Sequence, residues 1–218
     1  MFARAPVPGE AKTRLIPLLG GEGAAMLHAA LLRRALRCAI DAGIGEVALW
    51  CAPDASNPFF EACRNEFAVA LRAQLPGDLG RRMLAAFEAQ RGHLLLIGSD
   101  CPMLTPELLR LCASELERGL DAVFLPAEDG GYALIGLARP VASLFNGVGW
   151  STERVMEETR ARLRAAALSW SEPAIVWDVD RPRDVARLVA SGLLPEWRSL
   201  VPSPAEGCDT GPGAITPM

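Results

Sequence analysis

The residues best suited to chemistry begin with two basic side chains in a Pro/Gly-rich segment near the N-terminus, PVPGEAKTRL (6–15). Lys12 is the only lysine among 22 basic residues, and Arg14 follows two positions later. The backbone amides of a turn that contains Pro8 and Gly9, together with an ammonium group and a guanidinium fork, could bind phosphate groups. A solvated basic loop is the alternative interpretation. A Walker A loop is excluded, because GEAKT lacks the glycine that precedes the lysine in that motif.

Three aspartates follow apolar runs of strand length. Asp100 follows Ser99 at the end of HLLLIG (93–98), and Asp178 and Asp180 lie two apart in WDVDRPRD. Each acid could hold a turn or a helix start, and Asp180 in particular fits a helix N-cap. Carboxylates are also the ligands that Mg²⁺ and Mn²⁺ prefer. If the two segments are close in space, we expect Asp100 and Asp180 to share one such ion.

The segment QLPGDLG offers groups that could recognise a nucleobase. Gln74 has both a donor and an acceptor, and Gly77 and Gly80 would let a planar ligand approach the backbone. The alternative is a plain turn in which Asp78 caps the following helix.

A second group of residues could line the site of an acceptor molecule. Tyr132, the only tyrosine, stands beside two glycines in EDGGYALIGL, and a Trp-Ser-Thr sequence precedes an expected helix. A tight hairpin turn and a hydroxyl cap are the alternative interpretations of these two segments. The expected acceptor residues are Gly130, Gly131, Tyr132, Trp150, Ser151 and Thr152.

Composition excludes several other functions. The net charge of −4, with 22% charged residues, argues against nucleic acid as a partner. The six cysteines are scattered without a CxxC pair, which argues against zinc and for buried free thiols. Neither His28, within an expected helix, nor His93 belongs to a nucleophilic triad, so neutralisation of phosphate charge is the remaining chemistry. We expect no membrane span or secretory signal, and a cytoplasmic protein.

Helical and strand patterns alternate along most of the chain, which indicates an α/β fold with a mostly parallel sheet and helices on both faces. We expect one domain over residues 1–200 and a Pro/Gly-rich tail over 201–218. The first strand, MFARA, is short for a buried strand. The other expected strands are 46–51, 69–74, 93–98, 121–127, 131–137 and 174–179, and the helices are 22–43, 57–67, 78–92, 105–119, 151–166 and 181–192.

Six motifs in order, up to about residue 190, resemble a bacterial family of unknown function in the GT-A (nucleotide-diphospho-sugar transferase) superfamily. The motifs are PVPGEAKTRL, QLPGDLGRRM, LLIGSDCPML, EDGGYALIGL, GWST and WDVDRPRD. Their order is also similar to nucleotidyltransferases of that superfamily, including phospholactate guanylyltransferases and molybdenum-cofactor enzymes.

The resemblance implies a three-layer α/β/α sandwich, a nucleotide site in the N-terminal half and a divalent metal. It assigns Lys12 and Arg14 to the phosphates, Gln74 and 77–80 to the base, and Asp100 to the metal, with Asp180 as the second metal position and Asp178 near it. The segment GSDCP contains one aspartate, whereas many glycosyltransferases carry two there in a DxD motif. This difference favours the nucleotidyltransferases of the superfamily somewhat.

We therefore expect a metal-dependent transferase that uses a nucleotide or nucleotide-sugar donor and a small-molecule acceptor. Glycosyl transfer from a nucleotide-diphosphate sugar is the first expectation, with Lys12, Arg14 and Asp100 as the catalytic residues. The alternatives are nucleotidyl transfer with release of pyrophosphate, and an inactive nucleotide-binding module.

Overall fold

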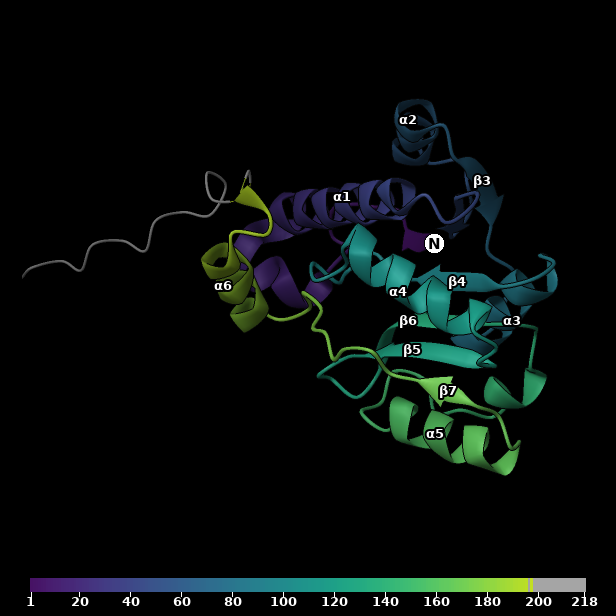
Figure 1. The fold of residues 1–218 in the computed structure, drawn as a ribbon. Helices are drawn as coiled ribbons and strands as arrows, with labels where there is room; N and C mark the ends of the chain where they lie inside the picture. The colour runs from purple at the N-terminus through teal and green to yellow at the C-terminus, as the bar shows by residue number, and fades with distance from the viewer. Residues whose placement is uncertain (196, 198–218) are drawn as a thin grey trace, which may run out of the picture.

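The computed structural model describes residues 1–195 and 197 (Figure 1), so the tail expected over 201–218 lies outside the described residues. Strands and helices alternate along this part of the chain, as predicted. The strands are β1 (Phe2–Arg4), β2 (Ala48–Ala52), β3 (Ala70–Ala73), β4 (Leu94–Ile97), β5 (Ala122–Pro126), β6 (Tyr132–Leu137) and β7 (Trp170–Ser171). The α-helices are α1 (Ile16–Ala42), α2 (Pro58–Phe67), α3 (Leu79–Glu88), α4 (Pro106–Glu117), α5 (Val155–Ala165) and α6 (Pro182–Ser191).

The strands form a three-stranded sheet in the order β1-β2-β3 and a four-stranded sheet in the order β4-β6-β5-β7. The pairs in the first sheet and the β5–β7 pair are parallel, whereas β6 runs antiparallel to both of its neighbours. The reversal at β6 follows from the Asp-Gly-Gly turn, where Gly130 has φ 91° and donates to the carbonyl of Ala127. The mostly parallel α/β fold is confirmed, with β6 as its reversed strand.

Helices cover both faces of the strands, as Figure 1 shows for α1 and α2 on one side and α5 on the other. Because successive strand residues point to opposite faces of the sheet, β5 contributes side chains to the apolar layers on both faces. Its Val123 and Leu125 pack with α1, α2 and α4, while Phe124 packs with α3 and α5. A third apolar cluster joins the first half of α1 to α6. These layers confirm the three-layer α/β/α sandwich.

Helix α1 starts six residues before the expected start at 22, with Pro17 in its first turn and a break at Gly20 (φ 69°). By length and composition alone, the stretch Thr13–Ala42 is apolar enough to cross a membrane. Core helices of globular proteins have the same property. In this fold the buried leucines of α1 pack against the sheet and against α6, so its apolar face belongs to the core.

Two other expected elements differ from the structure. The strand expected over 174–179 is absent, apart from an isolated bridge between Val176 and Ala127, and β7 lies earlier in the chain. The helix expected from residue 151 begins at Val155, because the hydroxyl of Thr152 donates to the carbonyl of Gly149 in a preceding turn and caps no helix. The five described cysteines are buried and free.

Candidate functional site

A cavity of about 460 Å³ lies at the carboxyl ends of β1 and β4, the edge where parallel α/β sheets bind ligands. Five of the predicted site residues line it: Lys12, Arg14, Gln74, Asp100 and Asp180. The other polar residues of its wall are Arg4, Glu10, Thr13, His28, Arg82 and Ser99. The structure thus brings together part of each group of residues predicted for phosphate, base and metal.

Lys12 is held at the base of the cavity by an unusual backbone. It has φ 50° and ψ 44°, a left-handed conformation that is uncommon for a residue with a side chain, immediately before the short 3-10 helix Thr13–Leu15. Its side chain is only 5% exposed, and its ammonium nitrogen lies 2.8 Å from Oδ2 of Asp100. The loop therefore aims one positive charge at the acid that follows β4.

Asp100 is surrounded by donors and positive charge. The Ser99 hydroxyl donates to its Oδ1 at 2.9 Å, and Nδ1 of His28 lies 3.5 Å from the same oxygen. Burial by itself would raise the pKa of Asp100, but Lys12 and His28 outweigh burial and hold this pKa well below its usual range. Asp100 is therefore a carboxylate at any pH near neutrality.

His28 also lines the cavity, although its position within an expected helix gave no sign of a role in the site. Its buried ring projects from α1, and Nε2 lies 2.9 Å from the carbonyl oxygen of Arg4 at the end of β1. Because that oxygen only accepts, Nε2 carries a hydrogen, and Nδ1 is left facing Asp100. His28 therefore connects the ends of β1 and β4, which belong to different sheets. Only its place within the apolar helix expected over 22–43 was visible in the sequence.

Asp180 reaches the cavity through a loop that is attached to β4. The backbone N–H of Val179 donates to the carbonyl of Asp100 at 3.0 Å, and the Asp180 carboxylate pairs with the guanidinium of Arg14. The N-cap interpretation of Asp180 is wrong: the capping acid is Asp184, which accepts from the N–H groups of Asp180 and Arg181. The side chain of Asp180 is thus free of a capping role.

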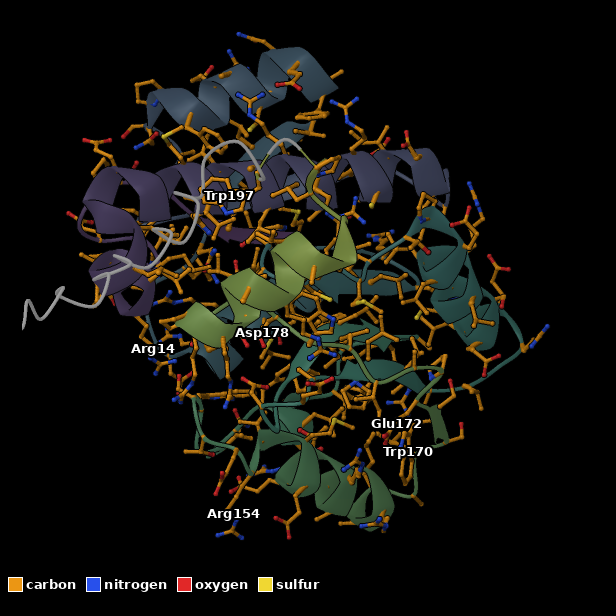
Figure 2. The ribbon with its side chains drawn as sticks, turned by 90° about the vertical axis from the view of Figure 1, so that its left-hand side faces the viewer. Arg14, Arg154, Trp170, Glu172, Asp178 and Trp197 are labelled. Carbon is orange, nitrogen blue, oxygen red and sulfur yellow. The ribbon has the colours of Figure 1, made fainter. Side chains whose placement is uncertain are left out.

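Asp178 lies beside this cavity without lining it. Figure 2 shows it on the same side of the molecule as Arg14, near the start of α6. Burial, followed by the negative charge of Asp129, raises the pKa of Asp178 to about 6, and Lys12 opposes the shift. Protons therefore compete for Asp178 at mildly acidic pH.

This raised pKa predicts a pH-dependent gain in stability for Asp178→Asn in the presence of EDTA. A folded-state pKa above the unfolded one disfavours the folded state as pH rises through 6, and the asparagine removes this cost. We expect about 2 kcal/mol of added stability at pH 8 and none at pH 4, measured by urea unfolding at both values. An equal gain at both values would show that the charge of Asp178 is not the source of the effect.

Gln74 differs in one respect from its expected role at the base. Its Nε2 donates to the carbonyls of Ala3, at 3.2 Å, and Trp50, at 2.9 Å. The amide nitrogen is thereby committed to backbone carbonyls of β1 and β2, and no described residue donates to the amide oxygen. Gln74 therefore presents an acceptor only, which suits a base edge that carries N–H donors.

Apart from Gln74, only Leu79 of the QLPGDLG segment lines the cavity, and the other residues have structural neighbours elsewhere. Asp78 caps α3 by accepting from the N–H of Arg81 at 2.8 Å, which is the alternative that the sequence left open. A Cβ on Gly80 would lie 2.6 Å from the carbonyl oxygen of Phe145 and 2.7 Å from the indole of Trp150. Gly80 thus allows α3 to pack closely. Pro8, Gly9 and Gly77 also lie outside the cavity lining.

The residues expected to bind an acceptor do not line this cavity. The hydroxyl of Tyr132 donates toward the sulfur of Met83 at 3.9 Å, its ring packs edge-on against Phe124, and burial raises its pKa. Tyr132 is therefore a core residue. The expected residues Gly130, Gly131, Trp150, Ser151 and Thr152 lie in the β5–β6 hairpin and the segment that packs on it before α5.

The donor set of the cavity suits a hard divalent cation. Asp100 and Asp180 supply carboxylate oxygens from two loops that are tied together by one backbone hydrogen bond. Within the described residues no group of three potential ligands is assembled, and both carboxylates are paired with basic side chains. Asp100 and Asp180 therefore fit Mg²⁺ or Mn²⁺ as its two protein ligands. Phosphate oxygens and water would fill the remaining coordination positions.

Comparisons with known proteins agree with this fold. A family model described as "Uncharacterized protein conserved in bacteria (DUF2064)" matches residues 28–152. A phosphoenolpyruvate guanylyltransferase of Rubrobacter xylanophilus is 32% identical over 201 residues, which cover 88% of this chain and 95% of that protein.

Solved structures extend the likeness. A candidate nucleotide-diphospho-sugar transferase from Desulfovibrio desulfuricans G20 is 29% identical, with a TM-score of 0.78, over 92% of this chain and 94% of that one. The fold alone is shared with glucosyl-3-phosphoglycerate synthase of Mycobacterium tuberculosis, in complex with Mn²⁺ and UDP (12% identity, TM-score 0.50, over 80% of this chain and 76% of that one).

These likenesses have two consequences. The chain is a transferase with the fold of nucleotidyltransferases and nucleotide-sugar transferases. The family model matches more than half of the chain, and the Rubrobacter relative aligns with it over nearly its full length. The chain therefore belongs to the bacterial family described as "Uncharacterized protein conserved in bacteria (DUF2064)".

Proposed function

We propose that this chain transfers a nucleoside monophosphate from a nucleoside triphosphate to a small anionic acceptor and releases pyrophosphate. The observation that supports this most is the cavity at the ends of β1 and β4, where the buried ammonium of Lys12 and the guanidinium of Arg14 face two carboxylates. Charges so arranged suit a chain of phosphates and its divalent counter-ion. This reverses the order of the sequence expectation, which placed glycosyl transfer first.

In this proposal an oxygen of the acceptor attacks the α-phosphorus, the bond to the bridging α–β oxygen breaks, and pyrophosphate leaves with that oxygen. Lys12 and Arg14 stabilise the negative charge that develops on the leaving group. Asp100 and Asp180 hold Mg²⁺ or Mn²⁺, which when bound supplies further positive charge beside the phosphates. The acceptor oxygen of Gln74 selects a base with N–H donors on its exposed edge.

Guanosine triphosphate and phosphoenolpyruvate are the substrates to test first, because the Rubrobacter relative is named for them. Guanine carries N–H donors, which agrees with an acceptor at Gln74. The remaining cavity arginines, Arg4 and Arg82, would suit the negative charge of a phosphorylated carboxylic acid.

The distinguishing experiment measures which bond breaks. Purified enzyme is incubated with Mg²⁺, phosphoenolpyruvate and each of the four nucleoside triphosphates, and pyrophosphate is followed by a coupled assay. Parallel reactions contain nucleotide-diphosphate sugars, and the release of nucleoside diphosphate is followed. Acceptor-dependent pyrophosphate release is the expected result. Nucleoside diphosphate released from a sugar nucleotide alone would establish glycosyl transfer instead, the candidate favoured by the Desulfovibrio structure.

Lys12→Arg should lower kcat/KM by about 30-fold while the protein stays folded, a loss of about 2 kcal/mol of transition-state stabilisation. The lysine side chain is 5% exposed and its ammonium contacts Asp100 directly, so a wider guanidinium would be displaced from the phosphates. Initial rates at varied nucleotide concentration provide the measurement. Unchanged rates would show that the only lysine of the chain is incidental.

A further inference from the structure

The two expected phosphate ligands and the two expected metal ligands are paired with each other. Lys12 contacts Asp100 at 2.8 Å, and Arg14 contacts Asp180. Each acid is therefore neutralised by the base that should bind phosphate, and each base by the acid that should bind metal. The pairing is notable because the four residues come from three separate segments of the chain.

We infer that divalent metal and nucleotide bind this site cooperatively by an exchange of partners: Asp100 and Asp180 pass from Lys12 and Arg14 to the metal, while Lys12 and Arg14 pass to the phosphates. The inference rests on the proposed function. It concerns the order and coupling of binding, which that function leaves open.

Electrostatics explains why either ligand alone binds poorly. A metal ion that arrives alone must compete with a base for each carboxylate, and it leaves that base without a partner. A nucleotide that arrives alone must compete with an acid for each base, and its phosphates then face two free carboxylates. When both bind, every charge has a partner of opposite sign. The free-energy coupling is reciprocal, so each ligand raises the affinity of the other by one common factor.

The two pairs should contribute unequally. The Lys12 side chain is 5% exposed and that of Asp100 39%, whereas the Arg14 and Asp180 side chains are 64% and 34% exposed. Water and salt screen the Arg14 pair more strongly. Opening of the Lys12 pair therefore accounts for most of the coupling.

The test measures Mn²⁺ binding without nucleotide, from the electron paramagnetic resonance signal of free Mn²⁺. Removal of a competing base should tighten binding, about threefold for Arg14→Gln and about tenfold for Lys12→Gln, within the range of measured couplings. Arg82→Gln is the matched control, because Arg82 lines the same cavity but donates to the carbonyl of Gly77 and pairs with no described acid. That control should stay within about twofold of the wild type.

The complementary measurement is GTP binding in EDTA by calorimetry. Asp180→Asn should strengthen it, since Arg14 is then free for phosphate, and should weaken the gain in GTP affinity that Mn²⁺ gives. Formation of the Mn²⁺–GTP complex in solution is measured separately and subtracted. Thermal unfolding of each variant checks the fold. If Lys12→Gln fails to fold, Arg14→Gln still tests the inference, because the Arg14 side chain is exposed and its substitution leaves the core intact.

The outcomes separate the inference from the proposed function. Equal gains in Mn²⁺ affinity for Arg14→Gln and Arg82→Gln would overturn the exchange. The loss of any positive charge in the cavity would then be enough to explain the tighter binding of Mn²⁺. Binding of both ligands to the wild type without mutual enhancement would also overturn it and leave nucleotide transfer intact. Failure of every nucleotide to bind, with or without Mn²⁺, would instead remove the proposed function.

Discussion

Replacement of Asp100 by asparagine is expected to lower kcat/KM for nucleotide transfer by about a thousandfold, a loss of about 4 kcal/mol in transition-state stabilisation. The change keeps the size of the side chain but removes a charge that two basic residues face: Lys12 at 2.8 Å and His28 at 3.5 Å. It also removes one of the two carboxylates that fit the metal. Steady-state kinetics over a range of Mg²⁺ concentrations provides the measurement.

Asp54→Asn is the matched control for this result. Asp54 also follows the carboxyl end of a strand, β2, but its carboxylate accepts only from Ser56 and it does not line the cavity. Its loss should leave kcat/KM within about twofold of the wild type. If Asp100→Asn were as active as this control, the cavity at β1 and β4 would not be the catalytic site.

Gly130→Ala is expected to cost about 3 kcal/mol of folding stability or more, and to lower Tm by about 6–12 °C. A Cβ at this position would lie 1.9 Å from the carbonyl oxygen of Glu153, and the glycine has φ 91°. The obstacle is backbone, which cannot rotate away as a side chain can. Differential scanning calorimetry gives the change in Tm, and loss of soluble protein would be the extreme form of the same result.

Gly147→Ala separates crowding from backbone conformation. Gly147 also has a positive φ, 65°, but an added Cβ would meet nothing within 4 Å. Its substitution should therefore cost only the conformational penalty, about 1 kcal/mol. Equal losses for the two variants would contradict the close approach of the hairpin to the segment before α5.

Local signals determined where several helices begin. Thr105 with Pro106, Asn57 with Pro58, and Asp78 each place a capping oxygen at the start of a helix, and in each case the side chain accepts from a backbone N–H in the structure. The start of α5 was missed, since Arg154 at its N-cap makes no side-chain cap, and the hydroxyls of GWST serve an earlier turn.

The sequence by itself determined the alternation of strands and helices, and it placed Lys12, Arg14, Gln74, Asp100 and Asp180 at one edge. The reason is physical: apolar periodicity and caps are local, and the carboxyl ends of parallel strands meet at one edge of a sheet. The fold therefore brings such residues together without further information.

Only the tertiary structure decided which of these residues face one another and what the others do. His28 was hidden because its role depends on two residues that are distant in the chain, Arg4 and Asp100, and no local pattern reports such a contact. Tyr132 was misjudged for the same reason, since α3 and β5 bury its ring beside Met83 and Phe124. The pairing of each expected phosphate ligand with an expected metal ligand likewise arises from contacts across 88 and 166 residues, which sequence spacing cannot set.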